Sequence, residues 1–220
     1  MTFHIRSMTK EDISQVANID REAFPTMWPP INFKHELTNK LAHYAVCCDK
    51  KRETKIAEEG PSRVVSNHSF LSFRWLFNTS KKEGIQSPPK SPPKTLEYVT
   101  GFTGIWLMVD EAHIINIAVK EEYRGKGLGE LLLISGIDMA SNLNAAVMTL
   151  EVRASNTVAQ SLYLKYGFQE AGVRKGYYTD NKENALIMTT DLISTDSFKE
   201  KFKKLKEAHW RKIKNVDYQI

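Results

Sequence analysis

The chain has 220 residues, of which 41% are apolar and 26% charged, enough for one domain with its own core. No apolar run reaches the roughly 18–20 residues that span a bilayer, and Met1–Lys10 lacks the apolar stretch of a secretory signal, so we expect a cytoplasmic protein without membrane contact. Most of the net charge of +5 comes from residues 193–220, which contain eight basic and four acidic residues. Because the rest of the chain is nearly neutral, the charge does not indicate a protein that binds nucleic acid over its whole surface.

The first fifty residues alternate between strand and helix patterns. Phe3–Arg6 predicts a short strand, and Thr9 can cap a helix that runs to about Phe24, where prolines end it. A second helix is expected over 33–41 and a strand over Tyr44–Cys48. The two cysteines that end this strand are adjacent and point to opposite faces, so we expect buried residues rather than a disulfide or a zinc site.

Residues 49–96 interrupt this pattern. The segment holds a charged run, an aromatic stretch at 70–77 and a proline-rich stretch at 87–94, and paired prolines fit inside neither a helix nor a sheet. Because a structureless loop of this length is unusual in a compact domain, we interpret the segment as an insertion between two strands. We expect the aromatic stretch to pack on the domain, and the alternative is a contact with a partner or a membrane interface.

From residue 98 the pattern becomes regular, with strands rich in β-branched and aromatic residues and helices with one apolar face. The strands are expected at 98–109, 113–119, 147–152, 168–172 and 185–191, and the helices at 127–142 and 156–166. Two strand–helix–strand passages in this order predict a mixed α/β fold.

A basic tail, 193–220, follows a domain that we place at 1–192. The tail starts with a capping-box pattern at Ser197–Glu200, and its apolar residues share one helical face. These residues are Phe198, Phe202, Leu205 and Ile213. We expect an amphipathic helix docked on the domain, and contact with RNA or an anionic surface is the alternative.

The strongest chemical signal is the passage from the strand that ends at Val119 through a glycine-rich loop into a helix. The loop has the sequence Arg124-Gly125-Lys126-Gly127-Leu128-Gly129. Glycines let the backbone come close to a ligand, and the first amides of the helix have no partner inside it, so the loop can hold a diphosphate. Its spacing matches neither the Walker nor the dinucleotide-binding pattern, and a glycine-rich turn without a ligand is the alternative.

This loop resembles the Gln/Arg-x-x-Gly-x-Gly/Ala motif of the GNAT acetyltransferases and follows the appropriate kind of strand. Further matching stretches lie downstream: Leu150–Asn156, Leu162-Tyr163, Gly167-Phe168, Arg174, Tyr177-Tyr178 and Ala185–Met188. The series is similar to the RimI-type branch, the ribosomal-protein-alanine N-acetyltransferases. The resemblance covers residues 3–191 apart from the insertion, which compact members of the family lack.

The resemblance implies an acetyl-CoA site between two splayed parallel strands, 113–119 and 147–152. A bulge near Asn116 or Ile117 would open the gap, and the pantetheine arm would bond to the free strand edge like an added strand. The residues expected to bind the cofactor are Ile117, Ala118, Val119, Arg124, Gly125, Lys126, Gly127, Leu128, Gly129, Glu130 and Asn156. No metal is expected.

By the same resemblance Glu151 is the base that takes the proton of the amine, directly or through water, and Tyr163 is the acid that protonates the departing thiolate. The alternatives are a surface pair of Glu151 with Arg153 or a lysine, and a Tyr163 that only fills the core. The residues expected to line the acceptor groove, unless they form only a structured hairpin, are Arg174, Tyr177 and Tyr178.

Together these expectations describe an enzyme that moves acetyl from acetyl-CoA to the N-terminal amine of a protein by direct transfer in a ternary complex. The expected acceptor is a ribosomal protein that begins with alanine. The alternatives are transfer to a lysine side chain or a small amine, a non-catalytic CoA-binding module, and an RNA-binding accessory protein that uses the tail. A monomer and a homodimer fit the sequence equally well.

Overall fold

The computed structural model describes residues 2–26, 29–55, 95–213 and 215–220. The chain divides into two units, one made of 1–53 with 97–220 and the other of 54–96. Of the second unit only the strand ends are described, so the aromatic and proline-rich stretches expected at 70–77 and 87–94 lie outside the described residues.

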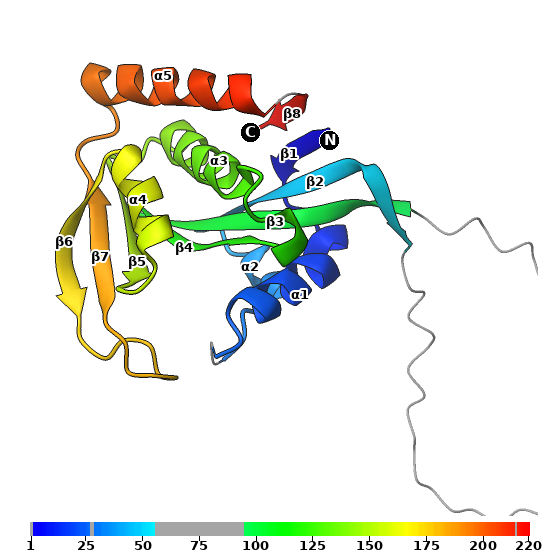
Figure 1. Cartoon of the computed structure of the whole chain (residues 1–220), viewed down its shortest axis with the longest axis horizontal. Coiled ribbons are helices and arrows are strands. Elements are labelled where there is room, and N and C mark those ends of the chain that lie inside the picture. The colour runs from blue at the N-terminus through cyan, green and yellow to red at the C-terminus, as the bar shows by residue number, and fades with distance from the viewer. Residues whose placement is uncertain (1, 27–28, 56–94, 214) are drawn as a thin grey trace, which may run out of the picture. The chain divides into compact units, whose positions relative to one another are not determined.

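The described strands form a mixed sheet in the order β6-β7-β5-β4-β3-β2-β1-β8 (Figure 1). The strands are β1 Phe3–Ser7, β2 Ala42–Lys55, β3 Thr95–Met108, β4 Glu111–Val119, β5 Val147–Arg153, β6 Phe168–Arg174, β7 Ala185–Thr190 and β8 Val216–Gln219. The helices are η1 Lys10–Asp12, α1 Ile13–Ala23, α2 Phe33–Glu36, η2 Glu121–Tyr123, α3 Leu128–Asn142, α4 Thr157–Lys165 and α5 Asp196–Lys212. The pairs β4–β5 and β1–β8 are parallel, and the predicted mixed α/β class is confirmed.

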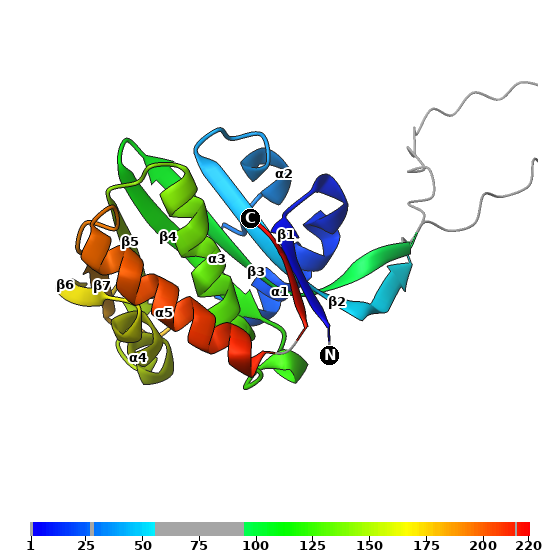
Figure 2. The same cartoon turned by 90° about the horizontal axis from the view of Figure 1, so that it is seen from above.

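Helices cover both faces of the sheet. In Figure 1, α1 and α2 lie below the strands, whereas α3, α4 and α5 lie above them, and Figure 2 shows α5 crossing over α3. The strands alternate accordingly: Met148, Leu150 and Val152 of β5 are buried in the core that α3 and α4 share. The side chains between them, Thr149 and Glu151, therefore point to the face that carries α1 and α2.

The helix expected at 33–41 ends after Phe33–Glu36. The polar residues that follow form local hydrogen bonds instead of continuing the helix: Thr38 Oγ1 donates to the carbonyl of His35 at 2.7 Å, and Asn39 accepts from the amide of Leu41 at 3.0 Å. Such side chains compete with the helical backbone, and the chain passes directly into β2.

The segment expected as an insertion at 49–96 contributes more strand than its charge suggests, because β2 continues to Lys55 and β3 begins at Thr95. Charged side chains fit there since they find partners: Lys50 pairs with Asp217 at 2.6 Å and Arg52 with Glu122 at 2.9 Å.

The tail forms a helix, as expected, but the cap lies two residues earlier than the pattern at Ser197 indicates. Thr195 Oγ1 accepts from the amide of Phe198 at 3.3 Å, and α5 follows. β8 was not predicted from the sequence; it adds to the sheet by pairing in parallel with β1. Within the described residues, no helix is both long and apolar enough to cross a bilayer.

Both cysteines are buried, as predicted, and neither forms a disulfide. Cys48 packs in the cluster beside α1, whereas Cys47 packs in the cluster beneath α3, on the opposite face of the sheet. Burial raises the pKa of the Cys47 thiol to about 12 and raises that of Cys48 as well.

Candidate active site

The two parallel strands at the centre of the sheet separate halfway along their length. β4 and β5 pair only as far as Ile114 and Leu150. The next residue of β4, Ile115, lies outside the register with β3, which resumes at Asn116 and so marks a β-bulge. The prediction of a bulge near Asn116 or Ile117 is confirmed. Beyond it, the edge of β4 that faces β5 has no pairing in the described sheet, and an extended ligand can bind there.

The loop after β4 presents its backbone at the start of α3. Gly125 and Gly127 have φ values of 73° and 81°, in the left-handed region that favours glycine. The first helical hydrogen bond runs from the amide of Leu131 to the carbonyl of Gly127, so the amides of 128–130 have no partner inside the helix. A Cβ on Gly125 or Gly129 would meet no atom within 4 Å. These amides and the positive end of the helix dipole fit a diphosphate.

The basic side chains of the loop fold back onto it. Lys126 Nζ donates to the carbonyl of Glu122 at 2.6 Å and lies 4.7 Å from the centre of the Tyr123 ring. Arg124 Nε donates to the carbonyl of Val119 at 3.3 Å. Both side chains are exposed, so either can turn toward a bound anion without breaking a buried contact.

The side chain of Glu130, expected among the cofactor-binding residues, is committed to other helices. It accepts a hydrogen bond from Tyr166 Oη at 2.7 Å, forms an ion pair with Lys165 and lies 3.3 Å from His209 Nδ1. The backbone amide of Glu130 is therefore the part that a ligand can use.

Glu151 lies next to the gap between the strands, with its side chain 10% exposed. His113 Nε2 is 3.0 Å from one carboxylate oxygen and Arg174 Nη2 is 3.0 Å from the other. The hydrogen bond from His113 lowers the pKa of Glu151, burial opposes that shift, and the charges of His113 and Arg174 reinforce it. Glu151 does form ion pairs, but with His113 and Arg174. The prediction of a pair with Arg153 or a lysine is wrong, because Arg153 binds Asp180 and Glu183 instead.

His113 is a site residue that the sequence analysis missed. Its Nδ1 lies 2.9 Å from Thr149 Oγ1, which itself donates to Glu111 at 2.6 Å. The contact with Thr149 holds the ring of His113 so that Nε2 faces Glu151. A titratable residue among the apolar residues of β4 was the available signal, and the parallel register places His113 beside Thr149 of β5.

Tyr163 lies on α4, on the side of the sheet that carries α3. Its ring packs against Phe168 at 5.7 Å between centres, and burial raises the pKa of its phenol to about 12. Among the described residues its hydroxyl has no hydrogen-bond partner, so it can donate to a ligand. Asn156 caps the same helix, as expected, by accepting from the amide of Ala159 at 3.1 Å.

The hairpin between β6 and β7 carries the remaining predicted site residues. The rings of Tyr177 and Tyr178 meet edge to face at 5.2 Å. Arg153 stacks 3.8 Å from the Tyr178 ring and pairs with Asp180 and Glu183, which ties the hairpin to the end of β5. The structured hairpin considered from the sequence is therefore present.

Tyr178 interacts electrostatically with both candidate catalytic groups. Burial raises its pKa to about 12, and the negative charge of Glu151 adds to the effect. In turn Tyr178 contributes to the raised pKa of Tyr163. The described residues thus include a carboxylate with a lowered pKa, a phenol with a raised pKa, a free strand edge and a loop that fits an anion. Such a site can bind a diphosphate-containing ligand and move protons at its other end.

Comparisons with known proteins show what this chain resembles. Residues 94–168 match the acetyltransferase (GNAT) family. A Bacillus subtilis (strain 168) protein, provisionally named a ribosomal protein bS18-alanine N-acetyltransferase, is 36% identical over 185 residues, which cover 84% of this chain and 92% of that protein. An N-alpha-acetyltransferase of Saccharolobus solfataricus is 30% identical over 192 residues, or 86% of this chain and 93% of that protein.

A solved structure also shares the fold. The crystal structure of the ribosomal-protein-S18-alanine N-acetyltransferase from Escherichia coli has a TM-score of 0.56 and 24% sequence identity. The match covers 87% of this chain and 94% of that one.

Proposed function

Because this chain belongs to the GNAT family and is an acetyl-CoA-dependent N-acetyltransferase, we propose that its acceptor is the N-terminal amine of a protein, namely a ribosomal protein that begins with alanine. The names of its relatives support this acceptor. The observation that carries the proposal is the ionised Glu151 beside the free edge of β4, where an amine can approach a thioester.

In the proposed reaction the amine nitrogen attacks the thioester carbon, and the carbonyl oxygen becomes an oxyanion that a backbone amide of the β4 bulge can stabilise. The nitrogen loses a proton to Glu151, directly or through water. The bond from carbon to sulfur breaks, and the departing thiolate takes the proton of Tyr163. Burial raises the pKa of Tyr163 to about 12, so the phenol is protonated at neutral pH, and the same shift makes it a weaker acid toward the departing thiolate.

Arg174 would act at the entrance for the acceptor. Its side chain is 54% exposed, so the guanidinium can move into solvent, and Glu151, 10% exposed, keeps His113 as a partner. An incoming amine can therefore replace Arg174 beside Glu151 at little cost. Tyr177 and Tyr178 would then pack against a short first side chain such as alanine.

Direct transfer in a ternary complex is supported by the cysteines. An acetyl-enzyme intermediate needs an accessible nucleophile, and both Cys47 and Cys48 are buried with raised pKa values. The acetyl group would thus pass from sulfur to nitrogen without an intermediate on a thiol of this chain.

The test uses the purified full chain, acetyl-CoA and a peptide with an N-terminal alanine and one internal lysine. We expect mass spectrometry to find one acetyl group on the α-amine, with release of one CoA thiol per transfer. A peptide whose N-terminus is already blocked is the control and should stay unmodified. Acetyl on the lysine alone would disprove the assignment in favour of a lysine acetyltransferase, and CoA binding without any turnover would indicate a non-catalytic module.

A further inference from the structure

Helix α5 ends against the phosphate-binding loop. A Cβ on Gly127 would lie 3.1 Å from His209 Cε1 and 3.1 Å from Ile213 Cδ1, so these two side chains occupy the space on that side of the glycine. Gly125 and Gly129 have open space at the same position. The loop therefore has a side closed by α5 and a side free for a ligand.

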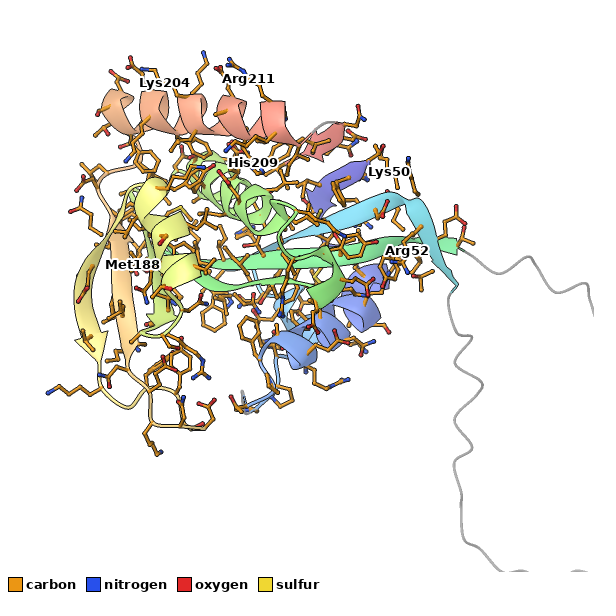
Figure 3. All side chains as sticks on the ribbon, in the orientation of Figure 1. Lys50, Arg52, Met188, Lys204, His209 and Arg211 are labelled. Atoms are coloured by element: carbon orange, nitrogen blue, oxygen red, sulfur yellow. The ribbon has the colours of Figure 1, made fainter. Side chains whose placement is uncertain are left out.

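His209 is unusual among the polar residues of α5. It is 3% exposed, and the nearest partners of its ring are Glu130 Oε2, 3.3 Å from Nδ1, and the backbone of Gly127, although neither contact has full hydrogen-bond geometry. Figure 3 shows His209 pointing from α5 toward α3, whereas Lys204 and Arg211 point away. A buried imidazole with only these incomplete hydrogen bonds costs stability, so core packing alone does not account for its place beside Gly127.

Glu130 connects His209 to two further elements. It lies in the first turn of α3 and also accepts from Tyr166, directly after α4, while Lys165 at the end of α4 pairs with it. The start of α3, the end of α4 and the last turns of α5 thus meet at one carboxylate, beside the loop.

The rest of the tail holds α5 in this place. Lys206 of α5 and Tyr218 of β8 both bind the Asp138 carboxylate of α3. Phe202 packs on Tyr166 at 6.3 Å between ring centres, and β8 pairs with β1 along the sheet. The position of His209 and Ile213 is therefore fixed by several independent contacts.

We propose that α5 and β8 form part of the coenzyme site, with His209 as a positioning residue that, together with Ile213, holds Gly127 in the conformation that binds the diphosphate. The inference rests on acetyl-CoA as the acetyl donor. A loop with two glycines has many unbound conformations, and a ligand binds more weakly when it must first order the loop. The contacts from α5 reduce that cost before the ligand arrives.

The test compares two acetyl donors. Acetyl-CoA carries the diphosphate, whereas S-acetylpantetheine has the same thioester and arm without it. In His209→Ala we expect the KM for acetyl-CoA to rise about five- to tenfold, and in the milder Ile213→Val about twofold. In both variants kcat should stay within about twofold of the wild-type value. Activity with S-acetylpantetheine should be unchanged in both variants.

Lys204→Ala, on the exposed face of α5, is the matched control and should behave as wild type with both donors. An equal loss with both donors would overturn the proposal, because it would mean a general structural defect, and so would an unchanged KM for acetyl-CoA. If His209→Ala does not fold, Ile213→Val is compared with the wild type instead. The rise in its melting temperature on adding CoA should then be smaller than that of the wild type. Wild-type chain that neither binds CoA nor uses it would refute the proposed function itself.

Discussion

Raising the pH is expected to reduce the preference of this enzyme for an α-amine over a lysine side chain. Glu151 is held as a carboxylate by His113 and Arg174, which lower its pKa. Even an ordinary glutamate, with a pKa of about 4.3, lies about 3.5 units below an α-amine at about 7.7–8.0. Taking a proton from a bound ammonium in advance would therefore cost at least about 4 kcal/mol.

Binding an amine that is already neutral costs less. At pH 7 roughly one α-amine in seven is neutral, which costs only about 1 kcal/mol, so the neutral amine is the reacting species. A lysine with a pKa of about 10.4 is neutral about 350 times less often at pH 7. Between pH 8 and pH 9.5 the α-amine is already mostly neutral while neutral lysine increases, and the ratio of the two falls roughly 20-fold.

The assay uses one peptide with both amines, at a concentration well below KM and with saturating acetyl-CoA. Mass spectrometry gives the ratio of α- to ε-acetylation at each pH, after subtraction of a reaction without enzyme. We expect a nearly constant ratio from pH 6 to pH 7 and a fall of roughly 20-fold from pH 8 to pH 9.5. A constant ratio over the higher range, or no lysine product at pH 9.5, would show that the shape of the groove sets the preference.

Three substitutions test other parts of the site. Tyr163→Phe should lower kcat about 10²- to 10³-fold with an unchanged KM for acetyl-CoA, because the ring still packs on Phe168; an unchanged kcat would remove the phenol from the mechanism. Glu151→Gln should lower kcat about 10²- to 10⁴-fold. The control Glu170→Gln removes an exposed carboxylate from β6 and should retain wild-type activity. Equal rates of the two variants would contradict a base at Glu151. Gly127→Ala should cost about 1–2 kcal/mol of unfolding free energy, because φ is 81° and the new Cβ would lie 3.1 Å from His209 and from Ile213. The same substitution should weaken CoA binding in calorimetry, and an unaltered affinity would argue against this loop as the phosphate site.

The strongly patterned elements of the fold were predictable from the sequence. The apolar residues of α3 and the alternation in β5 locate both elements within a residue or so of their bounds. α2 is shorter than expected because Thr38 and Asn39 bind the local backbone, a competition that periodicity does not record. β8 was missed because four residues carry little pattern, and the partner that makes them a strand, β1, lies at the other end of the sequence.

The site was predictable only in part. The GNAT resemblance is confirmed by the comparisons, and the loop and the bulge lie where the motif implies. The roles of Glu151, Tyr163 and the cofactor-binding residues stay predictions. His113 was missed because its meaning depends on which residue of β5 lies beside it, and no local pattern contains that register.

The position of the two thiols has a practical consequence for following the tail in solution. Cys47 and Cys48 are the only cysteines of the chain, and both are inaccessible on opposite faces of the sheet. Maleimide dyes should therefore leave the folded protein unlabelled, and a cysteine introduced at Lys204 would be the single reactive position. The fluorescence of a dye at that position, measured with and without coenzyme, would report on changes in the packing of α5 on α3.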